Sequence, residues 1–239
     1  MLDDAEVERI LVVTAHPDDV DFGAAGTVAT WTDRGIAVTY CVCTDGQAGG
    51  SDHSVSRTDM AALRRDEQRA AAAAVGVTDV RFLGYMDGEL QATHELRRDV
   101  SRVIREVRPQ RVLTQSPERW WERLGASHPD HRAAGDATID AVYPDARNPF
   151  AHPALLQDEG LEPWIVPEIW LMASPRADHV VDVSATFDRK IAALRAHVSQ
   201  TAHHDDLPGF VRSWMARAAA DAGLPEGSLA ERFQVVTVG

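Results

Sequence analysis

The sequence has little of what marks several large classes of protein. Only two of its 239 residues are cysteines, Cys41 and Cys43, so a disulfide framework is excluded and a reducing compartment suits the chain. No apolar run reaches the roughly 18 residues of a membrane span, and the acidic N-terminus lacks the basic and apolar regions of a secretion signal. We therefore expect a cytoplasmic protein without a membrane span.

Positive charge is also scarce. The formal net charge is −13, with 24 Lys and Arg residues against 37 Asp and Glu residues. Binding to a nucleic-acid backbone draws on clustered Lys and Arg, so nucleic acid is not an expected partner. The hydrophobic (44%) and charged (26%) shares are close to the globular average. Length and composition together predict a single domain over residues 1–239.

Short strand-like runs alternate with helical segments in the first half of the chain. Residues 10–15 (ILVVTA) form a continuous apolar run typical of a strand covered on both faces, and further runs follow at 38–44, 80–83 and 111–114. Helical spacing begins after Thr58 or Asp59 and ends at Gly76, and a second helix begins at Thr93 and ends before Pro109. This alternation predicts an α/β fold with a largely parallel central sheet.

The pattern loosens beyond Pro144. Residues 144–165 predict a variable loop or lid, and strands are expected at 168–172 and 179–183. Helices are expected at about 185–200 and 210–222, which would form a C-terminal helical segment. Cys41 and Cys43 lie two apart in a predicted strand, so both side chains should point to one side as buried thiols.

Two short motifs carry ionisable side chains just after predicted strands. Residues 16–19 (HPDD) follow the first strand, and residues 127–131 (SHPDH) follow the strand at 111–114 and begin a predicted helix. Ligands of open α/β sheets bind at the carboxyl ends of the strands, which is where both motifs fall. A dinucleotide site would instead show a glycine fingerprint in the first turn, so a Rossmann cofactor is not expected.

These residue types predict a catalytic metal centre. His131 can complete a site with His16 and one carboxylate, and three protein ligands leave a coordination position open, as in catalytic zinc sites. The remaining carboxylate is then placed to act as a general base. Spacing alone does not decide whether Asp18 or Asp19 binds the metal.

The motifs resemble those of the LmbE-like or PIG-L family of zinc N-deacetylases. The resemblance rests on residues 14–19 (TAHPDD), 63–73 (LRRDEQRAAAA), 82–90 (FLGYMDGEL) and 127–131, and it extends from about Ile10 to Gln200. It implies a Rossmann-like three-layer fold and a hydrolase that removes an N-acyl group, chiefly acetyl, from an amino sugar or its conjugate. It assigns Zn²⁺ ligation to His16, Asp19 and His131, and the role of general base to Asp18.

The resemblance also implies roles for residues around the metal. Protonated His128 would stabilise the developing oxyanion, while Arg64 and Asp87 would hold the sugar. Glu67 lies one helical turn from Arg64 and would orient its guanidinium. The family commonly has an acidic residue directly after the two aspartates, where this chain has Val20.

Several alternatives stay open at this level. An amidase that cleaves a thiol–sugar conjugate would act on the same N-acyl group, and another divalent transition metal would suit the same ligands. His16, Asp18 and His131 also match the two-His, one-carboxylate triad of a non-haem iron oxygenase. A non-catalytic sugar- or metal-binding module would not need a base at Asp18. No interface is marked, so a homo-oligomer is an open alternative.

Three further features have weaker functional interpretations. Residues 203–206 (HHDD) resemble a metal motif, but we expect a hydrophilic loop there. Trp120 and Trp121 precede the second motif and could wall a sugar pocket. His53 lies in a glycine-rich segment that predicts either a flap over the site or a flexible surface.

Overall fold

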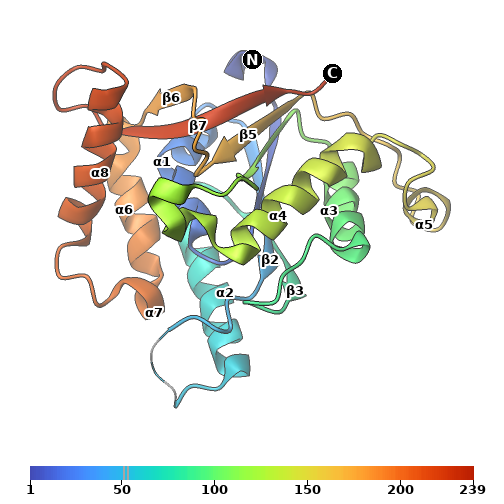
Figure 1. The fold of residues 1–239 in the computed structure, drawn as a ribbon, viewed down its shortest axis with the longest axis horizontal. Coiled ribbons are helices and arrows are strands. Elements are labelled where there is room, and N and C mark those ends of the chain that lie inside the picture. Colours follow the sequence, from blue (N-terminus) through green and yellow to red (C-terminus); the bar gives the residue numbers. More distant parts are fainter. Residues whose placement is uncertain (51, 53) are drawn as a thin grey trace.

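One seven-stranded sheet forms the centre of the molecule, with strand order β3-β2-β1-β4-β5-β7-β6 (Figure 1). The computed structural model describes residues 1–50, 52 and 54–239, so His53 lies outside the described residues. The strands are β1 (Arg9–Thr14), β2 (Ala37–Thr44), β3 (Asp79–Tyr85), β4 (Arg111–Gln115), β5 (Glu168–Met172), β6 (His179–Asp182) and β7 (Ala230–Thr237). The helices are α1 (Asp19–Asp33), α2 (Arg57–Ala74), α3 (His94–Val107), α4 (Pro129–Asp140), α5 (Pro153–Gln157), α6 (Phe187–Ala196), α7 (Val198–Thr201) and α8 (Leu207–Asp221).

The sheet is parallel from β3 to β5 and antiparallel at its other edge. β1 pairs with β2 and β4, β2 with β3, and β4 with β5, all in parallel. β7 pairs in the antiparallel sense with both β5 and β6. These findings confirm the predicted three-layer α/β fold with a largely parallel sheet. β7 was not predicted from the sequence; it follows the C-terminal helix and enters the sheet between β5 and β6.

Both faces of the sheet are covered, which explains the continuous apolar run in β1. Ile10 and Val12 pack with α1, α2 and α6, whereas Leu11 and Val13 pack with α3 and α4 on the opposite face. Adjacent strand residues point to opposite faces, so a strand buried on both sides needs apolar residues at every position. A third apolar cluster joins α8 to α6.

Helix ends follow the capping chemistry of the sequence, with two corrections. α2 is capped by the Ser56 hydroxyl, which accepts the N–H of Asp59, rather than by Thr58 or Asp59. The helix expected at 185–200 is interrupted at His197, whose ψ of 62° separates α6 from α7. Thr93 caps α3 as expected, and Gly76, at φ +85°, follows the end of α2.

Residues 144–165 are fastened to α3. The Arg105 guanidinium donates to the backbone carbonyls of Asp145, Ala146 and Asn148, and α5 lies within the segment. Its role as a lid stays a prediction. Among the described residues, no helix combines the length and apolarity needed to cross a bilayer.

Candidate metal centre and active site

The two His-Pro-Asp motifs meet at the carboxyl edge of the sheet. Residues 16–19 connect β1 to α1, and residues 127–131 lead into α4 after the segment that follows β4. β1 and β4 are parallel neighbours, with Val13 opposite Thr114, so their carboxyl ends lie side by side. Pro129 occupies the first turn of α4, where its missing N–H costs no hydrogen bond. The N-termini of α1 and α4 therefore open onto one site.

The structure brings the three predicted metal ligands together. Asp19 Oδ1 lies 3.0 Å from His131 Nε2, and Asp19 Oδ2 lies 3.5 Å from His16 Nδ1. Imidazole nitrogens and carboxylate oxygens are ligands that Zn²⁺ takes in proteins, so the chemistry of this donor set fits Zn²⁺. Burial alone would raise the pKa of Asp19, but His131 and His16 hold it well below its usual range, which keeps the carboxylate ionised.

The second nitrogen of His16 faces two carboxylates. Nε2 lies 3.1 Å from Asp87 Oδ1 and 3.2 Å from Asp130 Oδ2. Although burial opposes protonation, hydrogen bonds to Asp130, Asp19 and Asp87 raise the pKa of His16 to about 12. At that pKa the ring carries a proton on both nitrogens, with Nε2 facing Asp87 and Asp130 and Nδ1 facing Asp19. A metal ion at Nδ1 would take the place of that proton, while the two carboxylates would hold the proton on Nε2, which is how carboxylates orient metal-binding histidines.

His128 lies beside the two predicted histidine ligands. Nitrogen atoms of His16, His128 and His131 all lie within 4.8 Å of one another. The His128 Nδ1 accepts the N–H of Asp130, 3.2 Å away, and so caps α4. Burial, together with the charges of the neighbouring histidines, lowers the pKa of His128. Because Nδ1 accepts the N–H of Asp130, the ring proton lies on Nε2. The role of a protonated His128 in the reaction stays a prediction.

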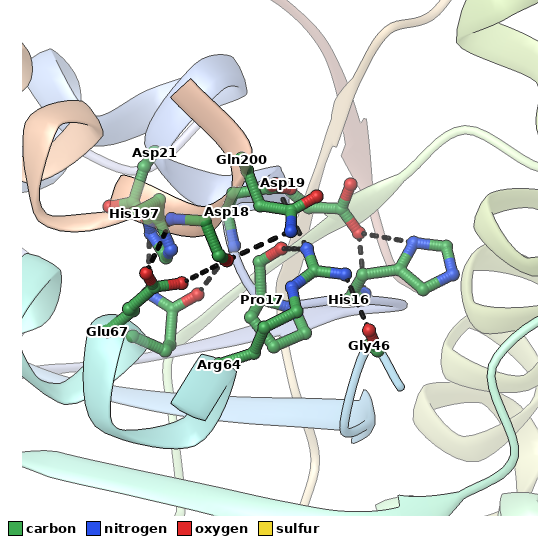
Figure 2. A network of polar contacts seen from close by, with 12 residues as sticks. His16, Pro17, Asp18, Asp19, Asp21, Gly46, Arg64, Glu67, His197 and Gln200 are labelled. Atoms are coloured by element: carbon green, nitrogen blue, oxygen red, sulfur yellow. Dashed lines mark hydrogen bonds and ion pairs between the residues drawn. The ribbon is translucent and has the colours of Figure 1, made fainter. Parts of the chain in front are cut away.

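Asp18 is held by Arg64 next to the predicted ligands (Figure 2). The guanidinium donates to Asp18 Oδ2 at 3.0 Å, to the Pro17 carbonyl at 2.6 Å and to the Gly46 carbonyl at 2.9 Å. Burial raises the pKa of Asp18 to about 6 against the opposing effect of Arg64. Arg64 is only 4% exposed, so most of its surface is used within the protein rather than presented to a ligand.

The predicted role of Glu67 needs revision, and Asp87 has contacts that the sequence did not predict. Glu67 does not orient Arg64: its two carboxylate oxygens accept the backbone N–H and the hydroxyl of Ser199, each at 2.7 Å. Asp87 contacts His16 through Oδ1 and accepts the N–H of Ala48 through Oδ2 at 3.0 Å. Helical spacing correctly placed Glu67 and Arg64 on one face of α2. The sequence does not show that Ser199 of α7 packs against that face.

Sequence reasoning missed four residues that surround the site. Asp130 could have been found, because it lies between two candidate histidines at the start of a helix. The other three, Asp21 of α1, Gln68 of α2 and His197 at the end of α6, are fully buried. They lie far apart in the sequence, and only folding brings them together. The polar contacts around Asp21 and His197 are seen beside Asp18 in Figure 2.

The weaker candidates have mainly structural contacts. Asp206 caps α8 by accepting the N–H of Gly209, and the ring of His204 stacks on Phe210 at an interplanar angle of 13°. These contacts agree with the expected loop at 203–206. Trp121 is 75% exposed, and its predicted role in walling a sugar pocket stays a prediction.

Comparisons with known proteins agree with this site. The family model described as "PIG-L: GlcNAc-PI de-N-acetylase" matches residues 11–142, a range that contains every predicted site residue. Diacetylchitobiose deacetylase of Thermococcus kodakarensis is 35% identical over 195 residues, which cover 82% of this chain and 71% of the relative. A probable N-acetyl-alpha-D-glucosaminyl L-malate deacetylase 2 of Bacillus cereus is 34% identical over 200 residues, covering 81% of this chain and 84% of the relative.

A solved structure is similar over almost the whole chain. N,N'-diacetylchitobiose deacetylase from Pyrococcus horikoshii, complexed with its inhibitor MPG, superimposes with a TM-score of 0.88 at 30% identity, covering 98% of this chain and 85% of that one. The predicted activity, removal of an N-acetyl group from an amino sugar, is the activity that the names of these relatives describe, and the prediction is confirmed at that level. The chain belongs to the PIG-L family.

Proposed function

We propose that the protein is a Zn²⁺-dependent hydrolase that removes the N-acetyl group from an amino sugar or an amino-sugar conjugate. One observation carries the proposal: His131, at the start of α4, meets Asp19 at the start of α1, 3.0 Å away and beside His16. Sequence-distant imidazoles and a carboxylate converge at the edge of the sheet where ligands bind in α/β folds. The names of the relatives support an N-acetylated amino sugar as the class of substrate.

In the proposed centre, His16 Nδ1, Asp19 and His131 Nε2 would hold the ion. When bound, Zn²⁺ would supply a Lewis acid for the amide carbonyl and would lower the pKa of a water molecule to about 7. Asp87 and Asp130 keep the proton of His16 on Nε2 and so fix the ring that faces the ion. Another divalent transition metal would find the same set of donor atoms.

Asp18 is proposed as the general base. It directly precedes the ligand Asp19, and Arg64 holds one of its carboxylate oxygens from the side. Asp18 takes a proton from the attacking water and then passes it to the nitrogen of the leaving amine. Arg64 acts in this scheme by positioning Asp18, and the predicted contacts of Arg64 and Asp87 with the sugar stay predictions.

His128 is proposed as the donor to the oxyanion. Its Nδ1 accepts the N–H of Asp130 at the start of α4. The Nε2–H is therefore free to donate to the carbonyl oxygen of the substrate as negative charge develops there. A neutral donor fixed by a helix N-terminus needs no reorganisation during the reaction. The cap therefore serves catalysis by fixing both the tautomer and the direction of the ring.

The other candidate functions lack such support. An iron oxygenase could use the same two imidazoles and one carboxylate, but the names of the reported relatives describe deacetylases. An amidase for thiol–sugar conjugates would use the same chemistry, but the names of the reported relatives point to N-acetylated amino sugars. The predicted cytoplasmic location and a homo-oligomer stay predictions.

The test measures metal content and acetate release in the same samples. Purified wild type, Asp18→Asn and His131→Ala are analysed for zinc and then assayed with a panel of N-acetylglucosamine, diacetylchitobiose and N-acetylglucosaminyl conjugates. We expect one zinc per chain in wild type and Asp18→Asn, and loss of zinc in His131→Ala. Asp18→Asn should lower kcat by about 10²–10⁴-fold, the usual contribution of a general base.

Thr39→Val is the matched control. It removes a hydrogen bond to Asp79 at 3.1 Å, and Asp79 begins β3 at the opposite edge of the sheet from the site. The control should keep wild-type zinc content and turnover. Undiminished acetate release by Asp18→Asn, or by metal-free wild type, would contradict the proposed mechanism.

A further inference from the structure

Asp18 adopts a backbone conformation that L-amino acids rarely use. Its φ of 86° and ψ of −22° lie in the left-handed region, which is unfavourable for a residue other than glycine. Asp18 is the N-cap of α1, yet its side chain makes no capping hydrogen bond. The turn therefore directs the carboxylate away from the helix end, and the surrounding protein must hold it in that state.

Gln68 of α2 holds the backbone of this turn. Its Oε1 accepts the N–H of Asp18 at 2.8 Å, and its Nε2 donates to Asp21 Oδ2 at 2.8 Å. A backbone N–H can only donate, so the oxygen of the Gln68 amide must face Asp18 and its nitrogen must face Asp21. The side chain is fully buried, which fixes this orientation.

Asp21 is in turn held by His197. Asp21 Oδ2 also accepts from His197 Nε2 at 2.8 Å, and both side chains are fully buried (Figure 2). Burial lowers the pKa of His197, but the hydrogen bond and the charge of Asp21 raise it overall, so the Nε2 proton is retained. Glu67 accepts two hydrogen bonds from Ser199 and fastens α7 next to His197.

This buried arrangement is not what stability alone would favour. Among the described residues, Asp21 Oδ1 and His197 Nδ1 are buried without a hydrogen-bond partner. Unpaired buried polar atoms are costly, and well-packed apolar groups in such places are often as stable or more stable. The neighbouring Val20, by contrast, is a fully buried apolar residue. Gln68, Asp21 and His197 nevertheless place polar groups beside the turn that carries Asp18.

We propose that Gln68, backed by Asp21 and His197, is a positioning residue that holds the Asp18 turn in its left-handed state. The inference rests on the proposed role of Asp18 as general base. Gln68 acts through the backbone of Asp18, whereas Arg64 acts on its carboxylate. Fixing both the backbone and the side chain leaves Asp18 one direction in which to accept a proton. A displacement of about 1 Å in such a group can lower turnover by ~10²-fold.

The first test replaces Gln68 with methionine, which keeps the volume of the side chain and removes both hydrogen bonds. Gln68→Met should lower kcat by ~10–100-fold, while KM and zinc content stay within about twofold of wild type. Thr39→Val, which loses one hydrogen bond at the far edge of the sheet, should change neither. Wild-type kcat in folded Gln68→Met, or an increase in KM alone, would overturn the proposal.

A double variant separates positioning from general damage. If Gln68 acts only through Asp18, Gln68→Met should not slow Asp18→Asn any further, because the base is already absent. An additional loss of the full ~10–100-fold would mean that Gln68 acts independently of Asp18, and the inference would fail. If Asp18→Asn itself keeps wild-type turnover, the proposed function fails instead, so the two failures are distinguishable.

His197 offers a second test, which also serves if Gln68→Met does not fold. In His197→Gln, the side-chain amide nitrogen can replace the Nε2 donor to Asp21, whereas His197→Leu removes it. We expect kcat near the wild-type value in His197→Gln and a loss in His197→Leu that resembles that of Gln68→Met. Equal kcat in the two folded His197 variants would refute the role of the donor.

Discussion

The most quantitative prediction concerns Lys190, the single lysine of the chain. Its side chain is fully buried in α6, and Nζ donates to the carbonyls of Asp21 and Phe22 at 2.9 and 2.7 Å and to Glu231 Oε1 at 2.7 Å. Glu231 of β7 also accepts the N–H and the hydroxyl of Thr27 in α1. One buried ion pair thus ties α6 and β7 to the helix whose N-terminus carries the site.

Replacement of Lys190 by methionine leaves the Glu231 carboxylate buried without its counter-charge. Breaking a buried pair in this way typically costs about 3–5 kcal/mol. The remaining hydrogen bonds from Thr27 soften the loss, so we expect a decrease of about 3 kcal/mol in the free energy of unfolding. Urea denaturation followed by tryptophan fluorescence measures it, because Trp31 and Trp170 lie in the core beside the sheet.

The double variant Lys190→Met/Glu231→Gln provides the control. It removes both charges and keeps an amide oxygen at position 231 that can accept from Thr27, but the amide nitrogen then faces the N–H of Gly26, which Oε1 accepts in the wild type. We therefore expect it to recover part of the lost stability. A decrease below about 1 kcal/mol in Lys190→Met would refute the reasoning, since a buried carboxylate cannot lose its partner so cheaply. So would a double variant that is as unstable as the single one.

Three further predictions follow from other contacts. Arg64→Met should lower kcat by ~10²-fold with little change in KM, because Arg64 positions Asp18; a rise in KM alone would favour direct contact with the sugar. Gly135→Ala should lower the free energy of unfolding by about 1–3 kcal/mol in urea titrations, because the new Cβ would lie 2.2 Å from the Gln115 carbonyl oxygen; wild-type stability would contradict this. Burial raises the pKa of Cys41 to about 12, so we expect both thiols to react with a thiol reagent only after unfolding, and rapid labelling of the native protein would contradict it.

The parts of the fold that follow from local patterns could be predicted from the sequence. The apolar run of β1 indicated a strand covered on both faces, and Ile10 and Leu11 do pack on opposite layers. β7 was missed because its burial alternates only weakly: Phe233 is buried, but the strand ends in exposed residues and includes the buried acid Glu231. That acid is compatible with the core only because Lys190 lies next to it.

Part of the site could likewise be predicted from the sequence, and part could not. The two His-Pro-Asp motifs carry their chemistry in consecutive residues, and the topology brings His16, Asp19 and His131 together. The partners of Arg64 and His197 could not be predicted, since they depend on how α2, α6 and α7 pack. Helical spacing suggested Glu67 as the partner of Arg64, but Ser199 occupies its carboxylate. Local periodicity identifies a face of a helix, and tertiary packing decides what that face meets.

Anomalous diffraction at the zinc absorption edge, from crystals of the purified protein, tests the central claim most directly. We predict one strong peak at about 2.0–2.2 Å from His16 Nδ1, Asp19 and His131 Nε2. A peak between Asp87 and Asp130 on the Nε2 side of His16 would contradict the proposed metal centre. So would the absence of any zinc peak in well-ordered crystals of the protein.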